Sequence, residues 1–260
     1  MSVLDSAAQV LRSFSAEFTA VTVTEISQRL AMPKSNASRL LRAMRDCGML
    51  ETIGDTKRFR PGPMLHSMGR IYRASSMLLS RAEEVVAAVS LETGHTGYVS
   101  KREGREVMAV TDHPGTNTLR VSSSIGRRLA AQASATGRSL LARLTDDEVR
   151  SLFTPWPEPP SPSAPQSCAE LIERLTDIRR TGYALSSDES NRGVAAIGVA
   201  VGDPDSGDEV SLCIACPVST TSQAELEHIA QRLLEGAHTI ASVTGDPHFP
   251  VIRPAYRMSA

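Results

Sequence analysis

The stretch MPKSNASRLLRAM, residues 32–44, decides how the N-terminal part of the chain is interpreted. Apolar residues recur in it at the spacing of one helical face: Ala37, Leu40, Leu41 and Met44. Pro33 disfavours helical geometry before it but suits the first turn of a new helix. We therefore predict a helix that buries this stripe. Its other face is basic, hydroxyl or amide, and no acidic residue occurs from Pro33 to Arg45. A merely solvated face normally mixes both signs of charge, so the pattern favours contact with a polyanion.

The neighbouring residues predict a winged helix-turn-helix around this helix. Residues 3–14 have the period of a first helix, and Thr22 with Glu25 fits a capping box that opens a second one. Residues 49–62, MLETIGDTKRFRPG, alternate around a Gly-Asp turn as a small hairpin would. Two short helices followed by a hairpin give the order of elements in this DNA-binding motif.

In such a motif the second helix lies in the major groove and the hairpin lies near the DNA backbone. Short polar and basic residues suit contacts with bases and phosphates. The candidate DNA-binding residues on the helix are Lys34, Ser35, Asn36, Ser38, Arg39, Arg42 and Arg45, and those on the hairpin are Lys57 and Arg58. Arg60 ranks below them because a structural role is an alternative for it.

Charge is distributed unevenly along the 260 residues, although the net charge is only −1. Residues 1–81 carry 12 basic against 6 acidic residues, whereas residues 82–260 carry 16 against 23. A basic N-terminal third fits a module that binds nucleic acid. The sequence has neither a membrane-spanning apolar run nor the layout of a signal peptide, so we expect a cytoplasmic protein.

Cys213 and Cys216 form a C-x-x-C, a spacing found in zinc and redox sites. The surrounding VSLCIACPV has the composition of a buried strand, on which residues three apart point to opposite faces. No second cysteine pair or nearby histidine pair completes a tetrahedral site. We therefore favour two independent core or pocket residues and predict no metal and no cofactor.

The remainder of the chain predicts an α+β organisation. Residues 63–80 have the pattern of a linking helix, and strands and helices follow it up to a last helix opened by a Ser222–Glu225 capping box. The Pro-rich segment 154–167 predicts a surface loop. We predict four parts: a winged helix-turn-helix (1–62), a linker helix (63–80), an α/β domain (81–246) and a C-terminal tail (247–260).

Several motifs together resemble the IclR family of bacterial transcriptional regulators. These are TVTEISQRLAMPKSNASRLLRAMRDCGMLE (22–51) with RFRPGPMLHSMG (58–69), then IGRRLAAQASATGRSLLARL (125–144) and IRRTGYALSSDES (178–190). Phe59 and Gly62 match an aromatic-x-x-Gly pattern on the wing. The resemblance covers nearly the whole chain.

The resemblance implies a GAF-like C-terminal domain that binds a small carboxylic-acid effector, and a homodimer or tetramer acting on double-stranded promoter DNA. Carried onto this chain, the family's effector-binding positions are Ser134, Thr136, Asp188, Cys213 and, through its backbone, Ala215. The small residues at 134–137 also predict a helix start whose N–H groups and hydroxyls meet a carboxylate, although plain helix capping is an alternative. Four positions depart from the family pattern near this pocket: Gln132 replaces a common His, Ala196 a common Cys, Gly198 a common Ala, and Ala200 a common Pro.

Two other functions remain as alternatives to an effector-controlled regulator. The first is a constitutive DNA-binding protein without an effector. The second is an enzyme with a basic appended domain, against which stands the absence of a nucleophile elbow, P-loop, dinucleotide fingerprint or paired metal-ligand motif. We predict no catalytic residue.

Overall fold

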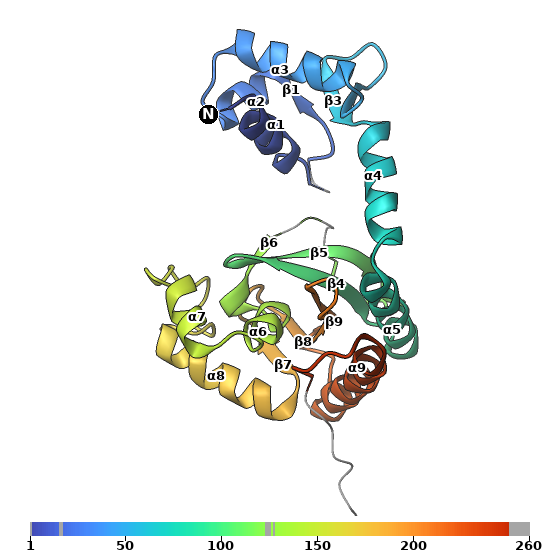
Figure 1. The fold of residues 1–260 in the computed structure, drawn as a ribbon, viewed down its shortest axis with the longest axis vertical. Coiled ribbons are helices and arrows are strands. Elements are labelled where there is room, and N and C mark those ends of the chain that lie inside the picture. The colour runs from blue at the N-terminus through green and yellow to red at the C-terminus, as the bar shows by residue number, and fades with distance from the viewer. Residues whose placement is uncertain (1, 16–17, 123–125, 127, 250–260) are drawn as a thin grey trace, which may run out of the picture. The chain divides into compact units, whose positions relative to one another are not determined.

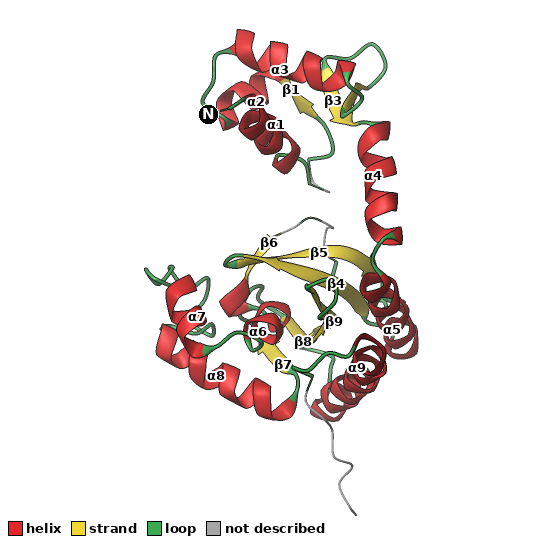
Figure 2. Cartoon of the chain, viewed as in Figure 1, coloured by secondary structure: helices red, strands yellow, loops and turns green. Residues whose placement is uncertain are grey.

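The computed structural model of the protein describes residues 2–15, 18–122, 126 and 128–249. It contains two compact units (Figures 1 and 2): the first holds the chain up to Ser76, and the second holds nearly all of it from Met77 onward. None of the helices in the described residues is long and apolar enough to cross a membrane. Residues 250–260, which make up most of the predicted tail, lie outside the described part.

Three helices form the body of the first unit: α1 (Val3–Arg12), α2 (Val23–Arg29) and α3 (Lys34–Asp46). Their inward residues, among them Val10, Ile26 and Leu41, form one apolar core. The capping box predicted at the start of α2 is confirmed. The Thr22 side chain accepts a hydrogen bond from the Glu25 backbone N–H, and the Glu25 carboxylate accepts one from the Thr22 backbone N–H.

A three-stranded sheet completes this unit, in the order β1 (Val21–Thr22), β3 (Arg58–Pro61), β2 (Leu50–Thr52). The predicted hairpin is the β2–β3 pair, and β1 is an addition that the sequence did not indicate. Phe59 reaches the core from β3. A Cβ on Gly62 would lie 2.5 Å from the Gly48 carbonyl oxygen. The aromatic-x-x-Gly pattern is thus a packing requirement where the wing returns to the end of α3.

The linking region contains two helices, not the single helix predicted over 63–80. The first, α4 (Pro63–Ala74), ends before two serines, and the second, α5 (Met77–Thr93), begins after them. The Ser75 hydroxyl donates to the Tyr72 carbonyl at 2.8 Å, a local bond that competes with helix continuation. α4 buries none of its residues and exposes Met64, Met68, Ile71 and Tyr72, whereas Leu78 and Leu79 of α5 are buried in the second unit.

The second unit is built on a six-stranded antiparallel sheet in the order β6-β5-β4-β9-β8-β7. Its strands are β4 (Thr96–Glu103), β5 (Glu106–His113), β6 (Arg128–Ala130), β7 (Ala184–Ser187), β8 (Val194–Asp203) and β9 (Asp208–Pro217). The two edge strands, β6 and β7, are only three and four residues long.

Helices cover both faces of this sheet. α5 and α9 (Gln223–Thr244) pack on the face that carries Val199, Leu212 and Ile214. The other face meets η1 (Ala131–Ala133), α6 (Ala135–Leu141), α7 (Asp146–Leu152) and α8 (Cys168–Thr181), which share a second core. This arrangement gives the α+β class and the mixed effector-type domain that the sequence predicts.

The start of α9 differs in one detail from the predicted Ser222–Glu225 capping box. The Ser222 hydroxyl accepts from the Glu225 N–H at 3.2 Å, as a cap should. The Glu225 carboxylate instead lies 2.9 Å from Nε2 of His95, a buried residue at the start of β4. A tertiary partner has taken the carboxylate that the local motif would have used.

Candidate functional site

The structure contains two candidate functional sites: the exposed face of α3 in the first unit and a cavity in the second. On α3, Ala37, Leu41 and Met44 of the predicted stripe are buried, and Leu40 is partly buried against the same core. Six of the seven candidate DNA-binding residues on this helix are exposed: Lys34, Ser35, Asn36, Arg39, Arg42 and Arg45. Ser38 is half-buried beside them.

The N-terminus of α3 is left open, unlike those of α1 and α2. Its N-cap is Pro33, which makes no side-chain capping bond, and its first turn holds no acidic residue. In α1 and α2 complete capping boxes occupy the same position, each with a carboxylate. The free N–H groups and the positive end of the helix dipole make an uncapped start a suitable place for a phosphate.

The basic side chains on this face differ in how their charge is already used. Arg45 is paired with Asp46 at 2.7 Å. Arg39 donates to Asn36 Oδ1 at 2.8 Å, a neutral partner that leaves its charge uncompensated. Lys34 and Arg42 have no ion pair with any residue that the structure describes. The uncompensated charge therefore lies on Lys34, Arg39 and Arg42.

The wing residues fall into two groups. Lys57 is exposed in the turn, and Arg58 is exposed while its guanidinium donates to the Ala20 carbonyl at 3.0 Å. Arg60 forms an ion pair of 2.6 Å with Glu51 across the hairpin, which agrees with the structural role considered for it.

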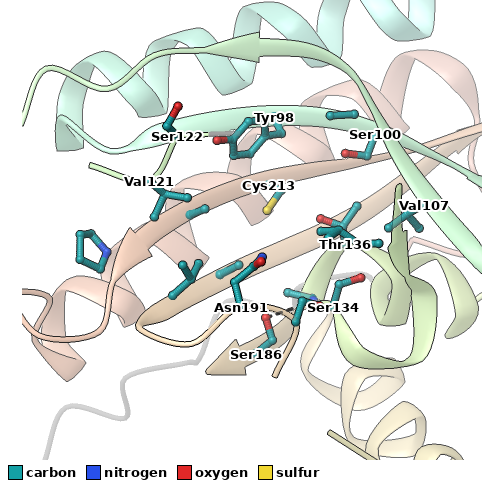
Figure 3. Close-up of a pocket in the computed structure, with 18 of the residues that line it drawn as sticks. Tyr98, Ser100, Val107, Val121, Ser122, Ser134, Thr136, Ser186, Asn191 and Cys213 are labelled. Atoms are coloured by element: carbon teal, nitrogen blue, oxygen red, sulfur yellow. Dashed lines mark hydrogen bonds between the residues drawn. The ribbon is translucent and has the colours of Figure 1, made fainter. Parts of the chain in front are cut away.

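A cavity of about 390 Å³ lies in the second unit, against the sheet face that α6 covers (Figure 3). This volume is in the range of small-molecule pockets. The register of the sheet builds its floor, because Tyr98 of β4 pairs with Cys213 of β9, and Ala196 of β8 with Ala215. The start of α6 and two loops, at 119–122 and 190–193, complete the wall.

The cavity brings together four of the five predicted effector-binding residues: Ser134, Thr136, Cys213 and Ala215. Burial raises the pKa of the Cys213 thiol to about 12, although a hydrogen bond with Thr136 opposes the shift. This thiol is therefore neutral at physiological pH. Cys216 lies three residues further along β9, so its side chain points to the opposite face of the sheet. The C-x-x-C pair therefore does not converge on a common ligand.

Asp188 is the exception: it is not among the described residues that line the cavity. It has a φ of +57°, and its carboxylate accepts a hydrogen bond from the Gly193 N–H. Its own N–H donates to the Val194 carbonyl at 3.0 Å. Asp188 closes the turn between β7 and β8, and its carboxylate is bonded within that turn.

Two backbone N–H groups at the start of α6 already have side-chain partners. The Ser134 hydroxyl accepts from the Gly137 N–H at 3.1 Å, and the Ala135 N–H donates to the Ser186 hydroxyl at 3.2 Å. A Cβ on Gly198 would lie 2.8 Å from the Ala135 carbonyl carbon, so glycine lets the helix start rest directly on β8. Capping, the alternative to carboxylate binding, accounts for Ser134.

Several cavity residues were not indicated by the sequence. They are Tyr98, Ser100, Val107, Arg120, Val121, Ser186, Ser190 and Asn191, among others. Strand alternation could have placed Tyr98 and Ser100 on one face of β4. The loop residues carry no such signal. No group of three or more His, Cys, Asp or Glu side chains suited to a metal ion occurs within the described ranges.

Family models match both units. The model described as "IclR helix-turn-helix domain" matches residues 3–54, and "Bacterial transcriptional regulator IclR C-terminal" matches residues 72–242. The chain belongs to the IclR family of bacterial transcriptional regulators. Its first unit is a helix-turn-helix DNA-binding domain, and its second is the family's effector domain.

Curated relatives of this IclR-family chain are regulators of transcription, not enzymes. It is 26% identical over 245 residues to the HTH-type transcriptional regulator XynR of Escherichia coli, covering 94% of this chain and 97% of XynR. It is 22% identical over 228 residues to the transcriptional repressor IclR of Escherichia coli, covering 86% of this chain and 83% of that repressor.

Solved structures of family members have the same fold. An IclR transcriptional regulator from Alicyclobacillus acidocaldarius superposes with a TM-score of 0.84 at 23% identity, over 94% of this chain and 98% of that one. An IclR homologue from Microbacterium hydrocarbonoxydans, solved with 4-hydroxybenzoate, superposes with a TM-score of 0.76 at 22% identity. The match covers 93% of this chain and 98% of that one.

Proposed function

We propose that this IclR-family regulator binds double-stranded promoter DNA through α3 and the wing, and that a small carboxylic acid in the cavity of the second unit controls that binding. The observation that carries the first half is the acid-free face of α3 with its uncapped start. In this proposal the exposed polar residues of α3 contact base edges, and Lys57 and Arg58 contact phosphates.

The cavity supports the second half of the proposal and disfavours a constitutive DNA-binding protein. Its lining combines apolar side chains with several hydroxyls, as in sites for small organic molecules. The homologue solved with 4-hydroxybenzoate makes aromatic acids a reasonable first group of compounds to test.

We further propose that the protein acts as a homodimer or tetramer in the cytoplasm. The exposed apolar residues of α4, three of which are Met64, Met68 and Ile71, support contact with a second copy. Light scattering should give a mass above that of one chain, and Ile71→Glu should shift it toward the monomer. A monodisperse monomer of the unmodified protein would contradict this part.

DNA binding is tested by fluorescence anisotropy with a duplex from upstream of the gene and a scrambled duplex of equal length. We expect preference for the upstream duplex and a steep fall in affinity with salt, because bound cations displace counterions from phosphates. Equal affinity for both duplexes would contradict a specific regulator. Adding a cavity-binding acid should change the affinity for the upstream duplex. No change would favour a constitutive protein.

A further inference from the structure

The charge in the wall of the cavity is concentrated in one side chain. Of the described residues that line it, Arg120 is the only basic one, and no carboxylate is among them. The others are apolar or neutral polar, including Ser100, Ser122, Ser186 and Asn191. A ligand that enters this cavity therefore meets one positive charge and no negative charge from its walls.

Two arginines on elements next to this cavity, Arg138 and Arg128, already have carboxylate partners. Arg138, on α6, is buried and forms a bidentate pair with Glu189, and it also donates to the carbonyls of Gln132 and Leu185. Arg128, on β6, pairs with Glu103 and Glu106. No hydrogen bond or ion pair joins Arg120 to another residue of the described ranges. Among the described residues that line the cavity, the uncompensated charge is that of Arg120.

The backbone around Arg120 is held on both sides. On one side, the Asn117 N–H donates to the Gly94 carbonyl at 3.0 Å, and the Asn117 side chain donates to the Thr93 carbonyl at 3.3 Å. On the other, the Thr96 hydroxyl donates to the Val121 carbonyl at 2.7 Å. Arg120 lines the cavity and is at the same time exposed, so it belongs to both the cavity wall and the solvent-facing surface.

The alternative place for an anion, the start of α6, already uses part of its hydrogen-bonding groups within the protein. The Ser134 hydroxyl and the Ala135 N–H already bond to protein atoms, and the helix has only seven residues. In Figure 3, Val121 and Ser122 lie on one side of the cavity, and Ser134 and Thr136 lie on the other. Arg120 directly precedes Val121 in the chain, so the charged residue belongs to the Val121 side, whereas the Ser134 and Thr136 side carries neutral hydroxyls.

We propose that Arg120 is the anion-binding residue of this cavity, and that the effector is a monocarboxylate held with its carboxylate at Arg120 and its uncharged body toward Thr136. The inference rests on the proposed effector function of the cavity and specifies its ligand class and orientation. One guanidinium matches one carboxylate, and guanidinium–carboxylate pairs are strong when bidentate. The apolar side chains of the wall accept a hydrocarbon body, and the hydroxyls accept a ligand hydroxyl or carbonyl.

The test measures binding to the full-length protein by thermal shift and calorimetry. The probes are monocarboxylates, including acetate, lactate, benzoate and 4-hydroxybenzoate, each beside its primary amide, which has nearly the same shape without the charge. The variants are Arg120→Met, Arg120→Lys and Ser134→Ala. Arg192→Met is the matched control, since Arg192 is an exposed arginine between two cavity-lining residues and does not itself line the cavity.

We expect one or more carboxylates to bind the unmodified protein at least about tenfold more tightly than the matching amide. Arg120→Met should remove that preference, and Arg120→Lys should restore part of it. Arg192→Met should change the affinity by less than about twofold. Added NaCl should weaken carboxylate binding to the unmodified protein but hardly affect binding to Arg120→Met.

Three results would overturn the inference. If carboxylate binding survives in Arg120→Met and is lost in Ser134→Ala, the anion lies at the start of α6, and the proposed effector function stands without this orientation. If amides bind as tightly as their acids, the cavity takes a neutral ligand. If no probe binds the unmodified protein, the proposed carboxylic-acid effector itself is contradicted, and Arg120 has no ligand to orient.

Discussion

Arg42 and Arg45 are separated by less than one turn of α3, yet of the two only Arg45 has an ion-pair partner within the described part of the chain, Asp46. We predict that Arg42→Ala weakens binding to the upstream duplex about tenfold or more and lowers the salt dependence by roughly one phosphate contact. Arg45→Ala should weaken it less, since part of its charge is already compensated. Anisotropy titrations at several salt concentrations measure both effects.

Arg150→Ala is the control for net charge, because Arg150 lies on α7 of the second unit. It should leave DNA affinity unchanged. The melting temperature of Arg42→Ala should stay at that of the unmodified protein, since Arg42 is exposed and unpaired within the described residues. If Arg42→Ala lowers the melting temperature without weakening DNA binding, Arg42 has a structural role instead.

A second residue-scale prediction concerns the buried pair of Arg138 and Glu189, whose side chains are only 2% and 6% exposed. Glu189→Gln leaves the guanidinium without a countercharge and should lower the free energy of unfolding by about 3–5 kcal/mol. Urea unfolding measures it. The double variant Arg138→Met with Glu189→Gln should recover part of the loss. A loss below about 1 kcal/mol would show that solvent compensates the charge.

At the scale of elements, the contact between α6 and β8 depends on Gly198. We predict that Gly198→Ala destabilises the second unit by about 1–3 kcal/mol, because the new Cβ meets backbone atoms of Ala135 and Thr136 that cannot rotate away. Gly69→Ala, on α4, is the matched control, since nothing lies within 4 Å of its added Cβ. It should be neutral or slightly stabilising. Equal effects of the two changes would contradict close packing at β8.

The end of α9 gives a pH dependence. Burial disfavours the charged form of Asp246, but hydrogen bonds and the charge of Arg143 outweigh it and lower its pKa below the ordinary 3.8. A lowered folded-state pKa contributes stability that is present above pH 3.8 and is lost as the pH falls below it. Asp246→Asn should therefore flatten the loss of stability between about pH 4 and 2. If urea unfolding shows the same fall in the free energy of unfolding at acid pH for both proteins, this prediction is wrong.

The elements also show what the sequence alone could predict. α3 has a clear apolar period, and the α2 cap is a local motif, so both were predictable. The two-residue strand β1 has no period to detect, and the break at Ser75 depends on which neighbours bury Leu78 and Leu79. The Glu225 carboxylate does not complete the predicted capping box, because it contacts His95, which is far away in the sequence.

The cavity was predictable only through the family resemblance, and only in part. Its walls come from strands and loops between Tyr98 and Pro217, and no local pattern reveals that Tyr98 pairs with Cys213. The positions carried over onto the regular elements α6 and β9 line the cavity. Asp188, in a left-handed turn, does not line it. No sequence pattern indicates Arg120, because its proposed role depends on its having no partner among the described residues.

At the scale of the whole molecule, the two compact units have separate cores. We predict that calorimetry resolves two unfolding transitions and that a bound carboxylate raises only the one that belongs to residues 77–249. Arg120→Met should remove that rise without moving the other transition. A single cooperative transition that shifts as a whole would show that the units unfold together.

The six-stranded sheet has one further consequence for the molecule in a crowded cell. Its edge strands, β6 and β7, are three and four residues long, so they present few unpaired backbone groups to another molecule. Longer open edges invite main-chain pairing between copies, which grows into fibres. Association of this chain should therefore proceed through side chains on its helices, and dilution should reverse it.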